Sequence, residues 1–504
     1  MYPIDFFWRA AAHHPDRTAV SSPDETLSFR ELAARVNRLG AALIALDPQA
    51  LSRVAIGASN SVGHLVALLA TIAAGKTWVP LNPRNGTPEL ERAISFTEPT
   101  IVVLDRKMHE RLPKLPTHLL LVDGSGPNSI DGAIAHQNPC LPALNLPLES
   151  TQAIKFTGGT TGMPKGVMQS MRAWNTTIVT QCLEFGFHQE DRFLISAPLT
   201  HGASTYVLAV LGAGGRLVFP YDTTSRSLLD TIQNQGITTL FMPPTAIYSL
   251  NDEQIRCARN ATTLRLLIYG AAAMPPSKIH ETQSIFGNIV ATTYGQTEAP
   301  TVIACLRPEL LADERNINSV GWPSAMTKVG IMNKEGKLLP PGTEGEIVVR
   351  GDLVMTGYWR MPEQTAATIV DGWLHTGDIG MLDDRGALFI KSRAREVIIS
   401  GGFNVYPQDV EDALGRHEDV YDSAVVGIED PKWGEAVHAA VHLRPDANVS
   451  AEEIIQFVKA EIGSVKAPKM IHFVSSLPKS PVGKTLKSEV SDWIRQTLNA
   501  THLG

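Results

Sequence analysis

The stretch Thr157-Gly-Gly-Thr-Thr-Gly-Met-Pro-Lys-Gly166 follows directly on a short apolar run, Thr151 to Phe156, that is typical of a β-strand. Glycines let a backbone approach a ligand closely, so successive N–H groups can surround an anion. The threonine hydroxyls and Lys165 add donors and positive charge. The stretch therefore predicts a phosphate-binding loop. It is not a Walker A loop, because that motif requires a glycine five positions before a Gly-Lys pair, and this pattern is missing here.

Six more motifs follow along the chain. They are Gly270-Ala-Ala-Ala273, Tyr294-Gly-Gln-Thr-Glu298, Trp373-Leu-His-Thr-Gly-Asp378, Arg393-Ala-Arg-Glu396, Ser400-Gly-Gly-Phe-Asn404 and Pro478-Lys-Ser-Pro-Val-Gly-Lys484. In this order the set resembles the adenylate-forming superfamily of acyl-CoA and aryl-CoA synthetases, luciferase and peptide-synthetase adenylation domains. The resemblance runs from about residue 10 to residue 490 and is closest to the freestanding acyl-CoA synthetases. It implies an ATP-dependent acid–CoA ligase that forms an acyl-adenylate, releases pyrophosphate and then makes an acyl-CoA thioester.

The resemblance assigns a nucleotide site. It implies that Tyr294 stacks on adenine, that Asp378 accepts hydrogen bonds from the ribose hydroxyls and that Arg393 assists. Thr297 would contact the α-phosphate, and Glu298 would hold Mg²⁺, since a carboxylate together with phosphate oxygens suits that hard ion. The remaining residues implied for ATP are Thr157, Gly158, Gly159, Thr160, Thr161, Gly162, Lys165, Gly270, Ala271, Ala272, Ala273, Gly295 and Gln296. Gly158 departs from the usual serine and removes one hydroxyl from the phosphate loop.

Adenylate formation and thioester formation would take place at one site. The resemblance therefore implies a domain that moves between the two half-reactions. By resemblance, Lys484 is catalytic and supplies positive charge to the carboxylate and α-phosphate during adenylation. Gly401 and Gly402 would lie against the pantetheine arm of coenzyme A, with Phe403 and Asn404 packed behind them. Arg395 occupies the hinge position, where the family commonly has Asp or Lys. Rotation about this residue would exchange the two surfaces.

The sequence says least about the pocket that would bind the acyl group. His201 matches a histidine that the family places beside the acyl pocket, where it joins Lys484, Thr297 and Glu298 as a catalytic residue. Thr200 replaces an aromatic residue often found there. The expected pocket residues are His201, Gly202, Ser204, Ala299, Pro300 and Thr301. Their small size favours an aromatic, cyclic or medium-chain acid, and no cationic residue is apparent that would suit a small dicarboxylate.

The rest of the sequence predicts an α/β protein. Short apolar runs alternate with helical patterns, which favours doubly wound parallel sheets in a large domain, residues 1–394. A capping box at Ser28 to Glu31 predicts an amphipathic helix that begins the chain. From about residue 325 to 394 the pattern becomes rich in strands and turns. We expect a small mobile α+β lid domain over residues 395–504.

Composition excludes several classes of protein. The net charge of −7 gives no general attraction for nucleic acid. The four cysteines are widely separated and lack a C-x-x-C pair, so neither a disulfide framework nor a zinc site is indicated. The apolar stretches are too short to span a bilayer, and the N-terminus lacks the pattern of a secretion signal. We expect a cytoplasmic protein; the sequence is compatible with a homodimer.

Three other functions remain open. The chain could load an acyl group onto the phosphopantetheine arm of a separate carrier protein, or oxidise its adenylate as a luciferase does. It could also be a binding protein without catalysis, which the presence of Glu298, Asp378, Arg393 and Lys484 disfavours. Turnover with free CoA distinguishes a CoA ligase from a carrier-loading enzyme.

Overall fold

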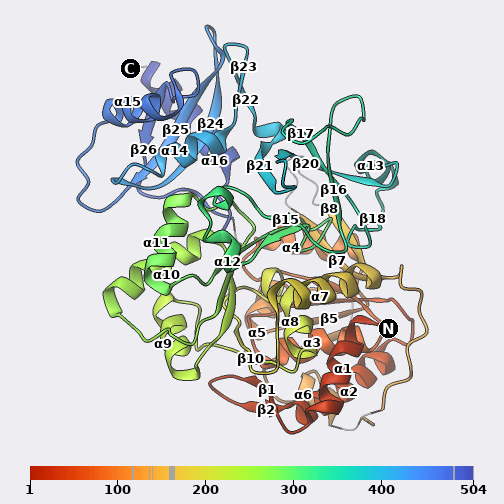
Figure 1. The fold of residues 1–504 in the computed structure, drawn as a ribbon. Helices are drawn as coiled ribbons and strands as arrows, with labels where there is room; N and C mark the ends of the chain where they lie inside the picture. Colours follow the sequence, from red (N-terminus) through yellow and green to blue (C-terminus); the bar gives the residue numbers. More distant parts are fainter. Residues whose placement is uncertain (116–117, 136, 139, 158–164, 481–482, 503–504) are drawn as a thin grey trace.

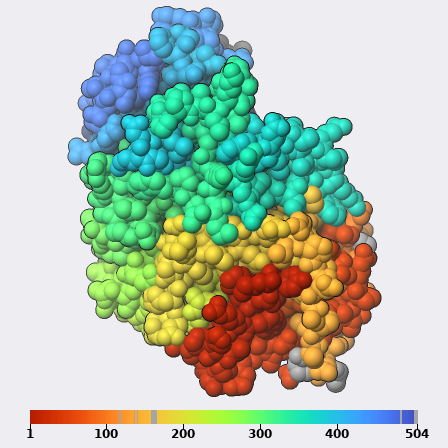
Figure 2. Space-filling model, turned by 45° about the vertical axis from the view of Figure 1, so that its right-hand side comes forward, coloured from red at the N-terminus to blue at the C-terminus, as the bar shows by residue number. Residues whose placement is uncertain are grey.

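The computed structural model describes residues 1–504 except 116–117, 136, 139, 158–164, 481–482 and 503–504. The chain runs from two sheet layers with their helices, through a β-rich part, to a C-terminal unit at one end of the molecule (Figure 1). Figure 2 shows this last unit, in blue, seated on the green and cyan part of the chain.

The first large sheet has nine strands in the order β15-β14-β13-β12-β11-β9-β10-β1-β2. The strands from β13 to β1 pair in parallel, while β2, β14 and β15 pair antiparallel at the edges. Their bounds are β1 (Thr18–Ser21), β2 (Thr26–Ser28), β9 (Arg192–Leu194), β10 (Arg216–Val218), β11 (Thr239–Met242), β12 (Leu266–Tyr269), β13 (Val290–Tyr294), β14 (Ala304–Leu306) and β15 (Trp322–Pro323).

The second large sheet has seven strands in the order β18-β8-β7-β4-β3-β5-β6. They are β3 (Arg53–Gly57), β4 (Thr77–Pro80), β5 (Ile101–Leu104), β6 (His118–Leu121), β7 (Thr151–Thr157), β8 (Lys165–Ser170) and β18 (Gly357–Tyr358). Strands β7 and β8 pair antiparallel, with Thr157 opposite Lys165. The expected phosphate loop connects these two strands, and its residues Gly158, Gly159, Thr160, Thr161 and Gly162 lie outside the described residues.

Helices pack on both sheets and form several hydrophobic cores with them. They are α1 (Pro3–His13), α2 (Phe29–Leu46), α3 (Val62–Ala73), α4 (Thr87–Thr97), α5 (Arg106–Arg111), α6 (Ile130–Ile134), α7 (Met171–Phe185), α8 (Gly202–Gly212), α9 (Ser225–Gln235), α10 (Pro244–Cys257), α11 (Pro276–Phe286), α12 (Pro308–Leu311) and the 3₁₀ turn η1 (Glu314–Asn316). Helix α3 is buried along its length except at Gly63, because one continuous core joins it to strands of both sheets. The alternation of strands and helices confirms the predicted α/β class.

The capping box at Ser28 is present. The Ser28 side chain accepts from the Glu31 N–H, and the Glu31 carboxylate accepts from the Ser28 N–H. This box starts α2, whose Leu32, Val36 and Leu39 face the core. The expectation that it begins the chain is wrong, because α1 and two strands precede it. Helix α1 has a proline at its first position and its own cap at Tyr2, signals that the sequence analysis did not use.

A five-stranded antiparallel sheet follows the large sheets. It contains β16 (Lys328–Met332), β17 (Gly345–Arg350), β19 (Ile369–Val370), β20 (Trp373–Leu382) and β21 (Leu388–Arg393), with α13 (Pro362–Thr368) between β18 and β19. Strand β20 begins at Trp373, because it pairs with β17 as far as Leu374 and with β19 at Trp373. The motif that ends in Asp378 is therefore part of a strand.

The C-terminal unit has its own sheet and core. The 3₁₀ turn η2 (Ala394–Glu396) leads into it from β21, and Arg395 is exposed in this turn. The sheet consists of β22 (Ile398–Ser400), β23 (Phe403–Val405), β24 (Val420–Asp430), β25 (Gly434–Leu443) and β26 (Met470–Phe473), with helices α14 (Pro407–Leu414), α15 (Ala451–Ile462) and α16 (Lys487–His502). Its core is separate from those of the large sheets. The domain boundary at residues 394–395 stays a prediction.

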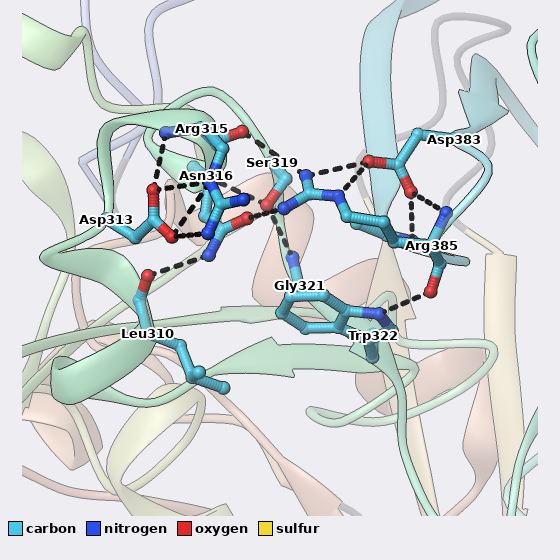
Figure 3. Close-up of polar contacts among 10 residues, drawn as sticks. Leu310, Asp313, Arg315, Asn316, Ser319, Gly321, Trp322, Asp383 and Arg385 are labelled. Atoms are coloured by element: carbon cyan, nitrogen blue, oxygen red, sulfur yellow. Dashed lines mark hydrogen bonds and ion pairs between the residues drawn. The ribbon is translucent and has the colours of Figure 1, made fainter.

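A polar cluster ties the β-rich part to the nine-stranded sheet (Figure 3). The Arg385 guanidinium donates to Asn316 Oδ1 at 2.9 Å, and the Trp322 indole N–H donates to the Arg385 carbonyl at 2.9 Å. Gly321 lies between these groups with φ of +87°. A Cβ at Gly321 would stand 1.9 Å from the carbonyl oxygen of Cys305. Only glycine therefore fits this junction.

This junction generates a stability prediction. Gly321→Ala should lower the free energy of unfolding by more than about 3 kcal/mol, because left-handed strain adds to a backbone clash. Gly336→Ala is the matched control: Gly336 also has a positive φ, +77°, but a Cβ there meets no atom within 4 Å. The control should lose only about 1 kcal/mol. Thermal unfolding of both variants measures the difference, and equal losses would contradict the close packing at Gly321.

Candidate functional site

Asp378, buried on β20, lies at the centre of the candidate site. Its Oδ2 accepts hydrogen bonds from the Tyr294 hydroxyl at 2.7 Å and from the Gln296 side-chain amide at 2.6 Å. Its Oδ1 lies 3.2 Å from Nε of Arg393, the residue directly opposite on β21. Burial and the nearby Asp378 carboxylate raise the pKa of Tyr294 well above its usual value, so Tyr294 remains a neutral donor. The structure thus brings together four of the predicted nucleotide residues.

The turn after β13 presents these donors. Gln296 and Ala299 exchange backbone hydrogen bonds, and the Gln296 amide also donates to the Thr376 carbonyl at 3.0 Å. A Cβ at Gly295 would stand 2.6 Å from the Thr301 nitrogen, so the turn needs glycine at this position. The Thr293 hydroxyl donates to the Thr301 carbonyl. These contacts hold the segment from Tyr294 to Thr301 in one arrangement.

Thr297 and Glu298 are held against the seven-stranded sheet. The Thr297 carbonyl accepts from the Gln169 side-chain amide at 2.8 Å, and Glu298 Oε1 accepts from the Tyr358 hydroxyl at 3.0 Å. The Lys165 ammonium lies 5.0 Å from the centre of the same Tyr358 ring. The site therefore places Glu298 and Lys165 beside one tyrosine, at the ends of the strands that enclose the predicted phosphate loop.

The described residues do not form a complete metal-binding site by themselves. No group of three His, Cys, Asp or Glu side chains that could hold a metal occurs among them. A single carboxylate such as Glu298 nevertheless suits Mg²⁺, which in phosphate sites is bound by one or two carboxylates, water and the substrate phosphates. The donor set fits an ion that arrives with a nucleotide.

Lys484 reaches the same site from the C-terminal unit. The Thr245 hydroxyl at the start of α10 donates to the Gly483 carbonyl at 3.1 Å. Burial lowers the pKa of Lys484; Arg393 acts in the same direction, while Glu396 and Asp378 oppose it. The charges that act on Lys484 are thus those around Asp378. Three hydrogen bonds also join the unit to the rest of the chain: Tyr421 to Asp252, Ser277 to Gly415 and Tyr406 to Glu344.

Gly401 and Gly402 do not join this site. Both are exposed at the turn between β22 and β23, with φ of +59° and +83°. The Gly401 N–H donates to the Trp433 carbonyl, and a Cβ at Gly402 would meet no atom within 4 Å. The expectation that Phe403 packs behind the glycines is wrong: Phe403 is 61% exposed, because β23 is an edge strand at the tip of the hairpin.

The expected acyl-pocket residues come from two segments. His201, Gly202 and Ser204 form the start of α8, and the Ser204 hydroxyl donates to the His201 carbonyl at 2.7 Å. Burial lowers the pKa of His201 to about 4, so its ring is neutral at pH 7. The Phe241 ring packs against both Gly202 and Gly270, since a Cβ at Gly202 would stand 2.5 Å from it and one at Gly270 3.3 Å. Ala299 and Pro300 are buried and Thr301 is partly buried, with Pro300 close to α7.

The sequence analysis missed three residues at the site. Tyr358, which holds Glu298, lies in the edge strand β18, and Gln169, which holds Thr297, lies in the neighbouring strand β8; neither belongs to a motif. Lys155 is buried on β7, with its ammonium 3.5 Å from Ser204 Oγ, and it also lowers the pKa of His201. The expectation that no cation lies near the pocket is therefore wrong. A charge inside an otherwise apolar strand, two residues before Thr157, was the signal that could have revealed it.

Family comparison agrees with the geometry. A model described as AMP-binding enzyme matches residues 7–359, and a model of the AMP-binding enzyme C-terminal domain matches residues 409–484. This chain belongs to the AMP-binding enzyme family. The two matches together include Tyr294, Glu298 and Lys484, while Asp378 and Arg393 fall in the interval between them.

Several members of this family are similar over most of the chain. Feruloyl-CoA synthase of Amycolatopsis sp is 32% identical over 96% of this chain and 97% of that protein. Medium/long-chain-fatty-acid–CoA ligase FadD8 of Mycobacterium tuberculosis is 37% identical over 71% of this chain, and the match spans only 64% of that protein. The structure of ATP-bound MatB from Rhodopseudomonas palustris superimposes with a TM-score of 0.90 at 29% identity, covering 98% of this chain and 99% of that one.

Within the part of the chain that the structure describes, no helix is both long and apolar enough to cross a bilayer.

Proposed function

We propose that this enzyme is an ATP-dependent acid–CoA ligase in which the C-terminal unit alternates between two positions. The observation that carries the proposal is the set of donors around Asp378, with the Gly483–Lys484 segment of the C-terminal unit held to the large domain by the Thr245 hydroxyl. Asp378, Tyr294 and Arg393 form a polar recess suited to ribose and adenine. Glu298, Lys165 and Thr157 lie beside the loop that would take the phosphates.

The first half-reaction would form the acyl-adenylate. A carboxylate oxygen of the acid attacks the α-phosphorus of ATP, the bond to the β-phosphate oxygen breaks, and pyrophosphate leaves. Lys484 would lie against the carboxylate and α-phosphate oxygens, where negative charge accumulates in the transition state. Thr297 would donate to the α-phosphate. Glu298 would hold Mg²⁺, which neutralises the phosphate charge when it is bound.

The second half-reaction would transfer the acyl group to CoA. The thiol sulfur attacks the acyl carbonyl carbon, the bond to the AMP oxygen breaks, and the thiol proton is released to water. In the arrangement described above, Lys484 is at the site and Gly402 is exposed to solvent. Rotation of the C-terminal unit about Arg395 would exchange them. The exposed turn η2 and the separate core of the C-terminal unit support such a movement.

For the carboxylic acid substrate we propose a chemical class. Gly202, Ser204, Ala299, Pro300 and Thr301 leave room for an aromatic, cyclic or medium-chain acyl group, and the feruloyl and fatty-acid ligases among the relatives support this range. The alternative is that the acyl group is loaded onto a separate carrier protein. The homodimer and the cytoplasmic location expected from the sequence stay predictions.

The first test is the reaction itself. The purified chain, given ATP, Mg²⁺, free CoA and a panel of aromatic, cyclic and medium-chain acids, should produce AMP, pyrophosphate and acyl-CoA, each measured by chromatography. ADP and orthophosphate as products would exclude adenylation. Adenylate formation without any acyl-CoA would instead favour the carrier-loading alternative.

A second prediction concerns Glu298. Glu298→Gln keeps the size of the side chain but removes its charge, so it should raise the Mg²⁺ concentration needed for half-maximal pyrophosphate exchange by about 10-fold or more. Glu309→Gln is the control, because Glu309 is exposed and pairs only with Arg307 among the ion pairs described. An unchanged Mg²⁺ dependence in Glu298→Gln would remove this carboxylate from the metal site.

A third prediction separates the two half-reactions. Lys484→Ala should slow adenylation by about 10²–10³-fold, the usual effect of removing one transition-state donor. Given chemically prepared acyl-adenylate and CoA, it should form acyl-CoA at nearly the normal rate. Lys466→Ala, which removes an ion pair with Asp409 inside the C-terminal unit, is the control and should affect neither step strongly.

Gly402→Leu should show the opposite pattern, with normal pyrophosphate exchange and slow acyl-CoA formation, because a branched side chain would block the pantetheine arm. Gly463→Leu is matched to it, since Gly463 also has a positive φ, +84°, and open space around its Cβ position. It should keep both activities. Equal damage to both steps by Lys484→Ala, or intact CoA turnover in Gly402→Leu, would contradict domain alternation.

A further inference from the structure

Lys155 is a buried cation without a described carboxylate partner. It is 8% exposed, and its ammonium lies 4.9 Å from the centre of the Trp78 ring and 5.6 Å from that of Trp174. Among the described residues its one hydrogen bond is to Ser204 Oγ, at 3.5 Å, longer than a usual N–H···O bond. Burial lowers the pKa of Lys155 to about 7, and no neighbouring acid offsets this shift.

Such an arrangement is costly to the folded protein. An ammonium removed from water needs hydrogen-bond acceptors or an opposite charge, and two indole faces compensate only in part. Lys76 shows how this chain satisfies a structural lysine. That ammonium is also buried, but it donates to the carbonyls of Asp47 and Gln49 and to the Ser52 hydroxyl. Lys155 has no comparable set of acceptors.

The lysine lies at the acyl pocket. Ser204 is one of the predicted pocket residues, and its hydroxyl donates to the carbonyl of His201. The Lys155 charge lowers the pKa of the His201 ring, in addition to the effect of burial. Further buried polar atoms without a described partner occur on the same or adjoining elements β4, α7 and α8: Trp78 Nε1, both side-chain polar atoms of Gln181 and the Tyr206 hydroxyl.

Lys155 and Lys484 are different cations with different surroundings. Lys484 follows Gly483, whose carbonyl accepts from Thr245 at the start of α10, whereas the Lys155 ammonium lies beside Trp78, Trp174 and Ser204. The activated carboxyl group must lie within reach of Lys484 in the proposed mechanism. Lys155 is therefore available for another part of the substrate.

We propose that Lys155 determines substrate choice by binding a second oxygen acceptor of the acid, a ketone or carboxylate oxygen other than the carboxyl group that is activated. This inference rests on the proposed function and names its substrate class: oxo acids and dicarboxylic acids rather than plain hydrocarbon acids. The ammonium donates to that oxygen, while the two indole rings pack against the adjoining carbon atoms. Substrate binding thereby supplies an acceptor that the described residues do not provide.

The test compares three acids of one carbon skeleton: the unsubstituted acid, its oxo derivative and its dicarboxylic derivative. The wild-type enzyme should have the higher kcat/KM for the two substituted acids. Lys155→Met should lower kcat/KM for both by about 10- to 100-fold, the effect of losing a hydrogen bond to a charged group, and should leave the unsubstituted acid unchanged or improved. Lys155→Gln keeps a donor without the charge, so it should retain the oxo acid better than the dicarboxylic acid.

Melting temperature gives a readout that does not depend on turnover. Lys155→Met should raise the melting temperature, because it replaces a poorly satisfied buried charge with an apolar chain of similar length. Lys76→Met, the matched control, should lower it, because three acceptors lose their donor. A Lys155→Met variant that melts lower and loses activity equally on all three acids would make Lys155 a structural residue and overturn the inference.

The two proposals fail in different ways. If the wild-type enzyme makes acyl-CoA equally well from all three acids, the proposed function stands and the inference about Lys155 is wrong. If none of the acids supports AMP formation, the proposed function is wrong, and calorimetric binding of the oxo and dicarboxylic acids decides the role of Lys155. Equal affinities for wild type and Lys155→Met would then overturn the inference, whereas a loss of about 10-fold or more in the variant would support it.

Discussion

The buried carboxylate of Asp378 is the group on which the arrangement of the site depends. It accepts from Tyr294 and Gln296, which follow the nine-stranded sheet, and pairs with Arg393, the last residue of β21. A buried carboxylate is stable only when such donors surround it. The same three donors therefore fix the position of the β-rich sheet relative to the large sheet, and they order the turn that carries Thr297 and Glu298.

The C-terminal unit is joined to this centre more loosely. Its sheet and core are its own, and the chain enters it through one 3₁₀ turn that contains the exposed Arg395. Most of the hydrogen bonds that cross the interface are single contacts, such as Thr245 to Gly483 and Tyr421 to Asp252. Separate cores with polar contacts between them permit rigid-body movement without unfolding either part. A single site can then receive a lysine in one position and a glycine turn in the other.

The expected acyl pocket combines close packing with polar groups that lack ordinary partners among the described residues. The start of α8 is packed so closely against Phe241 that Gly202 admits no side chain without displacing the ring. Beside this dense packing, Lys155 and several buried polar atoms lack ordinary partners in the described structure. Poorly satisfied polar groups in an otherwise well-packed region are typical of sites that await a ligand, because the ligand provides the missing contacts.

The sequence by itself determined the local features of this protein. The glycine- and threonine-rich loop and the capping box of Ser28 follow from spacing and residue type, while the motifs that resemble a known family named Tyr294, Asp378, Arg393 and Lys484 as candidate site residues. Each depends on a hydrogen bond, a helical period or a motif within a few neighbouring residues. For the same reason the α/β class could be predicted from the alternation of short strands and helices.

The tertiary structure decided which distant residues meet. The pairing of β20 with β17 and β21 places Asp378 inside a strand, and the packing of β4, β7, α7 and α8 puts Trp78, Trp174 and Ser204 around Lys155. The exposure of Gly402 likewise follows from the position of its hairpin at the edge of a sheet. Local patterns encode the period and direction of an element. They do not encode the distance between elements, which is set by the packing of residues far apart in the chain.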